Sequence, residues 1–280
     1  MKLYHQTGSR YTWNFESLAN DNAGDGLIFS PVNIESEKIF KIDTITKNKS
    51  FFDPQFYLIK EQKGKMHTYD YFPSNIKDDF NTTDFCKEST EIAQKCIDFQ
   101  LMNNFSYIVI PARYYDEFPS KYYEQFYENL IFPFISYCKA NRINKKILLT
   151  IILKQNKVVE QEDRDNLLNW ITSIQDIHGI YLIFQKNSTS KQIKDPNFLC
   201  SAMQFIHYLK LNNLEVHIGY NNTEGLLYSL ANPDSISMGL MKILEILTLN
   251  DLLSLKKLFK NLLEQDYTWR NYFNGLIMDT

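Results

Sequence analysis

Apolar residues occur along the chain in short runs that are separated by longer, amphipathic segments. Eight of these runs are rich in β-branched and aromatic residues, which is typical of β-strands. They span residues 2–6, 26–31, 51–59, 107–111, 146–153, 180–185, 214–219 and 235–238. The central runs are apolar at consecutive positions, so we predict strands that are covered on both faces, as in a parallel sheet.

Segments with apolar residues at helical spacing lie between most of these runs. They span residues 91–102, 121–140, 164–177, 196–212 and 223–230. Pro133 should kink or break the second of them, because proline removes a backbone donor inside a helix. The strongly apolar region 239–263 predicts two helices that meet near Asn250.

Strands that alternate with helices favour right-handed βαβ units and a parallel sheet. Eight such repeats in 280 residues match the α/β class and a (β/α)8 TIM-like barrel. The alternative is an open, doubly wound sheet, which one miscounted strand would favour. We predict a single barrel domain over 1–280, with 240–280 as its helical extension. The polar and aromatic stretch 60–89 is either a binding loop or a surface excursion.

The charge and the cysteine content indicate which partners and which cellular compartment to expect. The 33 acidic and 30 basic side chains leave a net charge of −3, which argues against a general nucleic-acid coat or an anionic-membrane binder. The four cysteines form no C-x-x-C pair and are expected to be reduced thiols in the core. No secretory leader and no apolar stretch long enough to cross a membrane is present. The expectation is a soluble, cytoplasmic protein without a membrane partner.

Functional side chains of a parallel barrel lie at the carboxyl ends of its strands. Asp53 interrupts the apolar run 51–59, and burial of an unpaired carboxylate costs several kcal/mol. Pro54, beside it, favours a strand end or bulge at this point. Asp53 therefore either caps a turn with its side chain or binds substrate and acts as a base at the barrel mouth.

Three further residues have side chains with functional groups suited to a site at the mouth of the barrel. His217 interrupts the strand 214–219 and either serves as an acid or base or forms a core hydrogen bond. His5, at the end of the first strand, has the same two interpretations. Arg113 directly follows the strand 107–111, where it either clamps an anion or lies on a solvated loop.

Gln55, Tyr220, Asn222 and Ser237 also follow strands or end them, and they are the candidates for binding the polar edges of a ligand. Metal-ligand spacings, phosphate-binding glycine loops and the G-x-S-x-G nucleophile motif are absent from the sequence. No cofactor and no metal is therefore predicted.

Two segments resemble the tRNA-guanine transglycosylases. Residues 216–239 (VHIGYNNTEGLLYSLANPDSISMG) keep the glycine turn, the E-x-L-L helix and an aspartate of a late barrel segment of that family. Residues 51–56 (FFDPQF) resemble its Asp-Ser-Gly-Gly-Phe-Gln motif. The resemblance implies a barrel that binds a nucleoside or nucleic-acid base. The chain departs from the family where Ser237 stands near the position of the nucleophilic aspartate, and it lacks both the double glycine and the Cys-rich zinc site.

Two functions follow from these patterns. The first is a barrel enzyme that acts on a small polar ligand, with Asp53 and His217 as catalytic residues. The second is an inert barrel that serves as an interaction subunit or homo-oligomer through the aromatic segment 121–134 or the apolar region 240–263. The first predicts that Asp53→Asn abolishes ligand binding and leaves the melting temperature nearly unchanged.

Overall fold

The computed structural model describes residues 1–58, 64–72, 82–114, 118, 121–185, 193, 195–222 and 224–238, with the side chains of 82–87 left aside. Eight strands form in this part of the chain. They are β1 (Lys2–Gln6), β2 (Gly26–Phe29), β3 (Phe51–Phe52), β4 (Ile108–Ile110), β5 (Ile147–Lys154), β6 (Gly179–Gln185), β7 (Glu215–Asn221) and β8 (Ser235–Met238).

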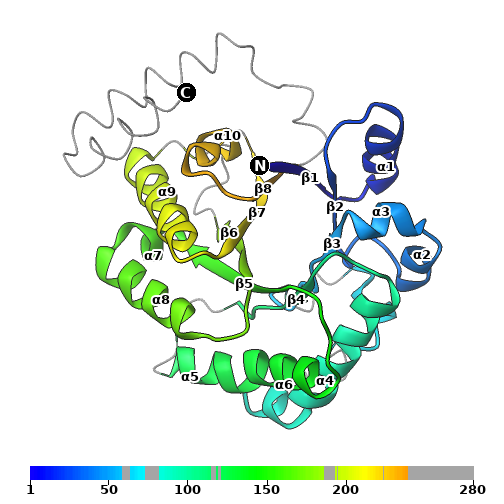
Figure 1. Ribbon diagram of the computed structural model, residues 1–280, viewed down its shortest axis with the longest axis horizontal. Coiled ribbons are helices and arrows are strands. Elements are labelled where there is room, and N and C mark those ends of the chain that lie inside the picture. The colour runs from blue at the N-terminus through cyan, green and yellow to red at the C-terminus, as the bar shows by residue number, and fades with distance from the viewer. Residues whose placement is uncertain are drawn as a thin grey trace.

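All strand pairs are parallel, and the strands follow one another in the order β3-β2-β1-β8-β7-β6-β5-β4. β1 pairs with β8, which curls the sheet so that its two end strands, β3 and β4, come next to each other. Figure 1 shows the resulting ring of strands, with the helices outside it. The protein is thus a (β/α)8 barrel with one seam, and the open doubly wound alternative is excluded.

Side chains close the seam between β3 and β4. Val109 pairs with no strand on this side, and the Gln100 side chain takes the place of a strand partner. Its Oε1 accepts from the Val109 N–H at 2.7 Å, and its Nε2 donates to the Val109 carbonyl at 3.2 Å. Just before the two strands, the Ser106 N–H donates to the Ser50 carbonyl at 2.9 Å. These bonds satisfy backbone groups that a complete ladder would otherwise pair.

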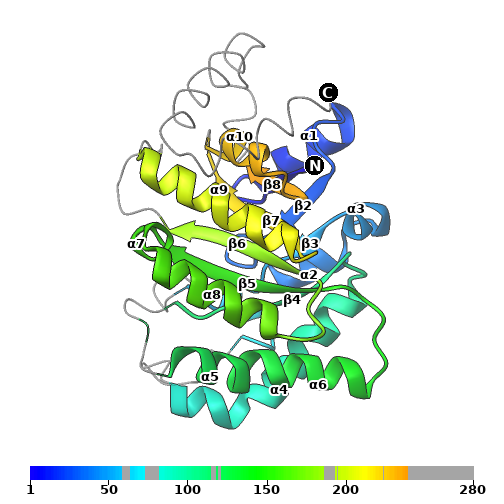
Figure 2. The ribbon, with the colours of Figure 1, turned by 60° about the vertical axis from the view of Figure 1, so that its left-hand side comes forward.

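The helices and helical turns of the described residues lie around the ring (Figures 1 and 2). They are α1 (Tyr11–Asn20), α2 (Ser36–Phe40), α3 (Thr44–Asn48), η2 (Met66–Thr68), α4 (Thr82–Met102), α5 (Tyr122–Phe126), η3 (Tyr127–Ile131), α6 (Phe132–Ala140), α7 (Gln155–Val159), α8 (Gln161–Ser173), α9 (Pro196–Leu211), α10 (Gly225–Tyr228) and η4 (Ser229–Ala231). None of the helices in this part of the chain is both long and apolar enough to cross a membrane.

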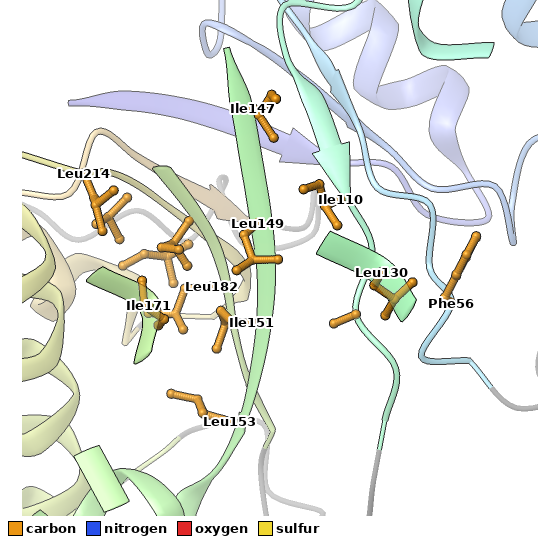
Figure 3. Close-up of a cluster of buried hydrophobic side chains, with 14 of the residues drawn as sticks. Phe56, Ile110, Leu130, Ile147, Leu149, Ile151, Leu153, Ile171, Leu182 and Leu214 are labelled. Carbon is orange, nitrogen blue, oxygen red and sulfur yellow. The ribbon is translucent and has the colours of Figure 1, made fainter. Parts of the chain in front are cut away.

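Buried apolar side chains form two clusters because strand residues alternate between the faces of the sheet. The larger cluster lies between the strands and the helices, where Leu149, Ile151 and Leu153 of β5 share it with Ile171 of α8 (Figure 3). The smaller cluster fills the barrel. Its buried members are Tyr4, Ile28, Phe51, Val109, Leu148, Tyr181 and Ile183.

Several predicted elements differ from the observed ones at their ends. The run 51–59 forms strand only at Phe51–Phe52, because Pro54 has no N–H and Gln55 has a left-handed backbone with φ of 56°. Helix α4 begins at Thr82, inside the stretch predicted to be irregular. Helices α1, α2 and α3 were not predicted. The helices predicted over 239–263 lie outside the described residues.

The aromatic segment 121–134 forms helix, and most of its rings are packed inward. Tyr122, Phe126 and Phe134 are buried, whereas Tyr127 and Phe132 are exposed. The helix continues from α5 through the π-helical turn η3 over Tyr127–Ile131 into α6, whose first turn contains Pro133. The helix is therefore distorted just before the proline and is not broken there.

Candidate functional site

Asp53 lies at the carboxyl end of β3 and accepts four hydrogen bonds. The Gln55 N–H donates to its Oδ1 at 3.1 Å. Its Oδ2 accepts from three tyrosine hydroxyls, those of Tyr57 at 2.5 Å, Tyr220 at 3.2 Å and Tyr181 at 3.3 Å. We call Asp53, Gln55, Tyr57, Tyr181 and Tyr220 the carboxylate–tyrosine cluster. It gathers residues from the β3 loop, β6 and β7 at the mouth of the barrel.

Burial controls the ionisation of this cluster. The Asp53 side chain is completely buried, and this desolvation raises its pKa from 3.8 to about 6. The hydrogen bonds from Tyr57, Gln55, Tyr220 and Tyr181 act in the opposite direction, because they favour the charged form. Burial also raises the pKa of each of the three tyrosines, so their hydroxyls remain protonated donors near neutral pH.

Tyr220 reaches Asp53 because β7 has a bulge at this residue. The pairing register between β7 and β8 shifts between Ile218 and Asn221, and Tyr220 has a left-handed backbone with φ of 56°. In a regular strand, Tyr220 would point to the helices, since His217 and Gly219 face the interior. The bulge turns the side chain inward. Such a conformation is costly for a tyrosine, and bulges of this kind occur next to active sites.

Gln55 has a left-handed backbone as well, and it connects the loop after β3 to the rest of the mouth. Its Nε2 donates to the Tyr220 hydroxyl at 2.6 Å, and its Oε1 accepts from the Val32 N–H at 3.0 Å. The hydroxyls of Tyr57 and Tyr220 are themselves 3.0 Å apart. The hydrogen bond between the side chains of Gln55 and Tyr220 therefore joins two residues with left-handed backbones, one in the loop after β3 and one in β7.

Gly219 leaves the space that the Tyr181 hydroxyl occupies. A Cβ on Gly219 would lie 2.5 Å from that oxygen, well inside van der Waals contact. The Tyr181 hydroxyl is completely buried and lies 3.3 Å from both Asp53 Oδ2 and Gln6 Oε1. The absence of a side chain at Gly219 is thus what allows Tyr181 to reach the carboxylate.

A second set of polar side chains continues the network around β1, β2 and β8. The Ser237 hydroxyl donates to Gln6 Oε1 at 3.2 Å and accepts from the Tyr220 N–H at 3.0 Å. Gln6 Nε2 donates to the Ser30 hydroxyl at 2.9 Å. Ser237 therefore supports the bulge at Tyr220 through the backbone, while Gln6 and Ser30 line the wall beside it.

The strands β4 to β6 contribute different residues to the same end of the barrel. Arg113, which follows β4, is 9% exposed. Lys154 ends β5 and lies 5.7 Å from the centre of the Tyr114 ring, whose hydroxyl accepts from Gln185 Nε2 at 3.0 Å. Arg113 and Lys154 place positive charge on this side, whereas Asp53 lies across the seam on β3. Asn222, half-buried after β7, donates its N–H to the carboxylate of Glu224 at 3.0 Å.

The structure does not bring Asp53 and His217 together. The His217 ring packs edge-on against Phe51, at 5.6 Å between centroids, and its Nδ1 is 2.8 Å from the Ser235 hydroxyl. Its Nε2 is 3.4 Å from the Glu215 carboxylate, near the start of β7. Phe51 precedes Asp53 on the interior face of β3, so His217 lies in a deeper layer of the barrel than Asp53.

His5 lies on the other face of the sheet from the cluster. Its neighbours Tyr4 and Gln6 point into the barrel, and His5 instead contacts the Ala23 carbonyl through Nε2. Burial lowers the pKa of His5, which favours its neutral form. Among the described residues, no three metal-ligating side chains converge, and His5, Asp53 and His217 do not form such a set.

Sequence reasoning proposed Asp53, Gln55, Tyr220 and Ser237 for this site but missed Tyr57 and Tyr181. Tyr181 is an interior residue of the mostly apolar strand β6, and a tyrosine there needs a partner for its hydroxyl. This requirement is the feature of the sequence that could have identified Tyr181. No comparable feature identifies Tyr57, because its position depends on the turn made by Pro54 and Gln55.

Comparisons with known proteins find similarity of architecture alone. No protein-family model and no curated protein matches the sequence. Among solved structures, the native form of CbXyn10B has a TM-score of 0.48 at 11% identity, over 85% of this chain and 84% of that chain. Macrophomate synthase has a TM-score of 0.36 at 11% identity, over 97% of this chain and 84% of that chain. Structural similarity at this level does not indicate the function of the protein.

Proposed function

We propose that the protein is a barrel enzyme that acts on a small polar ligand at the carboxylate–tyrosine cluster. The bulge at Tyr220 is the observation that carries this proposal. It places a tyrosine in a strained conformation with its hydroxyl 3.2 Å from a completely buried carboxylate. Strain of this kind persists where the surrounding structure imposes it, and it is concentrated at functional sites.

Asp53 has the properties of a general acid or base. Because its pKa is about 6, the Asp53 carboxyl is closer to an even balance of its two protonation states near neutral pH than a carboxyl with the usual pKa of 3.8. The hydroxyls of Tyr57, Tyr181 and Tyr220 donate hydrogen bonds that stabilise the charged form of Asp53 in the absence of substrate. His217 is not part of this proposal, since it lies below Phe51.

The ligand must offer Asp53 either proton donors or a positive charge, because it has to replace neighbours of Asp53 that are donors. A nucleoside or nucleic-acid base offers proton donors through its N–H groups. Both segments that resemble the transglycosylases contribute to the cluster, 51–56 through Asp53 and Gln55, and 216–239 through Tyr220. Arg113 and Lys154, which lie at the carboxyl ends of β4 and β5, are the residues that would bind an anionic group of such a ligand.

Ligand-observed NMR tests the proposal with a library of nucleosides, bases and other small polar compounds. We expect hits that bind the wild-type protein and lose at least tenfold in affinity in Asp53→Asn. Asp176→Asn is the matched control, because Asp176 pairs with Lys139 on the surface, and the binding of the hits should be unchanged there. Hits that bind both variants equally would place the ligand elsewhere and contradict the proposal.

The second candidate function, an interaction subunit, is favoured by one observation. Tyr127 and Phe132 are 40% and 55% exposed, although the other rings of segment 121–134 pack inward. Sedimentation velocity of the wild-type protein and of Phe132→Ser tests it. Self-association that the substitution abolishes would support this function, and a monomer at all concentrations would count against a homo-oligomer.

A further inference from the structure

Asp53 is a buried anion with no cationic partner among the described residues. Its four hydrogen-bond donors are one backbone N–H and three tyrosine hydroxyls, all of them neutral. No lysine, arginine or histidine in the described part of the chain forms an ion pair with it. A buried carboxylate is usually paired with a positive charge, and within the described residues Asp53 has no such partner.

The walls around Asp53 are aromatic. The rings of Tyr57, Tyr181 and Tyr220 bring their hydroxyls to its Oδ2. Below it, Phe51 packs edge-on against Tyr181 at 5.3 Å between centroids. Aromatic rings attract cations that lie over their faces.

We propose that the ligand of the carboxylate–tyrosine cluster is a small organic cation, a protonated or quaternary amine whose charge is balanced by Asp53. This inference rests on the proposed function, since it assigns a ligand class to the same site. A cation supplies the charge that Asp53 lacks, and the tyrosine rings supply the walls. A neutral ligand would replace the tyrosine hydroxyls with other neutral donors and leave the buried charge as it is.

The route to Asp53 passes through its two outer tyrosines. Asp53 and Tyr181 are completely buried, whereas Tyr57 and Tyr220 are half-buried at the mouth. A cation that reaches Oδ2 displaces one of these two hydroxyls, whose oxygens lie 3.0 Å apart.

Cation binding should depend on pH through Asp53. The titratable groups that face it are Tyr57, Tyr181 and Tyr220, with Tyr71 behind them, and burial raises the pKa of all four. These tyrosines stay neutral, so Asp53 alone changes charge between pH 5 and 8 in this set. Since the cation binds the charged carboxylate, its affinity should fall by up to tenfold for each pH unit below the pKa of Asp53.

The experiment compares choline with its neutral carbon isostere, in which a carbon atom replaces the ammonium nitrogen. Protein-observed NMR titrations are run at pH 7.5 and pH 5 at constant ionic strength, in sodium and in potassium chloride. We expect choline to bind at least tenfold more tightly than the isostere at pH 7.5 and to lose most of that preference at pH 5. Asp53→Asn should abolish the preference, while Asp176→Asn, which removes a surface carboxylate paired with Lys139, should retain it.

Other results would contradict the proposal that the ligand is a small organic cation. Equal binding of choline and its isostere would show that charge is not recognised. Displacement of choline by potassium but not by sodium would identify an inorganic ion as the occupant. If nucleosides bind with dependence on Asp53 and choline does not, the ligand class is wrong and the proposed site stands. If no probe perturbs Asp53 or Tyr220, the proposed function fails together with the inference.

Discussion

Replacement of Asp53 by asparagine should make the protein more stable at neutral pH. Burial raises the pKa of Asp53 from 3.8 to about 6, so holding it ionised in the folded state costs about 3 kcal/mol relative to the unfolded state. Asparagine is uncharged and avoids this cost. Its amide group needs new partners, and a donor left without one costs about 1–3 kcal/mol, although the tyrosine hydroxyls can rotate to accept from it.

The net expectation is a gain of about 1 kcal/mol, which raises the melting temperature by about 2–4 °C in a domain of this size, whereas the sequence alone led us to expect a nearly unchanged melting temperature. The sign of the pH dependence follows from the raised pKa. Below pH 3.8, Asp53 is protonated in both states and the two proteins should be equally sensitive to pH. As the pH rises, the unfolded wild-type chain ionises first, so the wild type loses stability relative to Asp53→Asn until about pH 6. Above that pH the difference is constant.

Urea unfolding of both proteins between pH 4 and pH 8 measures this difference directly. The reasoning is refuted if Asp53→Asn is less stable than the wild type by 2 kcal/mol or more at all pH values. That result would mean that Asp53 acts as a structural cap of the turn at Gln55, whose N–H it accepts at 3.1 Å. A gain in stability combined with lost ligand binding is the pattern expected of a functional residue that the fold tolerates at a cost.

Two further substitutions test the geometry of the site and of the seam. Gly219→Ala places a Cβ 2.5 Å from the Tyr181 hydroxyl and should destabilise the protein by about 1–3 kcal/mol, with a shift of the Tyr181 ring signals in NMR spectra; unchanged signals would show that Tyr181 does not need this space. Gln100→Leu removes both bonds to Val109 and should cost about 2–4 kcal/mol, with faster hydrogen exchange of the Val109 amide. Gln94→Leu, at an exposed position of the same helix, is the control and should leave that exchange rate unchanged.

The barrel could be predicted from the sequence because its signals are local. Apolar runs such as those around β5 and β6 have no polar face, so they must be covered on both sides, and the alternation with amphipathic segments then fixes a parallel sheet. The seam between β3 and β4 could not be predicted in the same way. Gln100 lies on the face of α4 that also carries Cys96, and nothing in the sequence distinguishes it from a glutamine that faces solvent.

Part of the site could be predicted for a similar reason. Asp53 was found because a polar residue in an apolar run needs an explanation, and Ser237 because it lies at the end of a strand. His217 met the first criterion and His5 the second, but neither criterion tells which face of the sheet or which layer a side chain occupies. His5 turned out to face the helices, and His217 lies below Phe51 with Ser235 and Glu215 as partners.

The bulge at Tyr220 shows why the centre of the site escapes such reasoning. Strict alternation from His217 and Gly219 would direct Tyr220 outward, and only a shift in the pairing of β7 with β8 turns it to Asp53. That shift depends on Ser237 of another strand, whose hydroxyl accepts the Tyr220 N–H. A residue whose direction is decided by a partner seventeen positions away leaves no local pattern, and here it provides the contact on which the proposed chemistry depends.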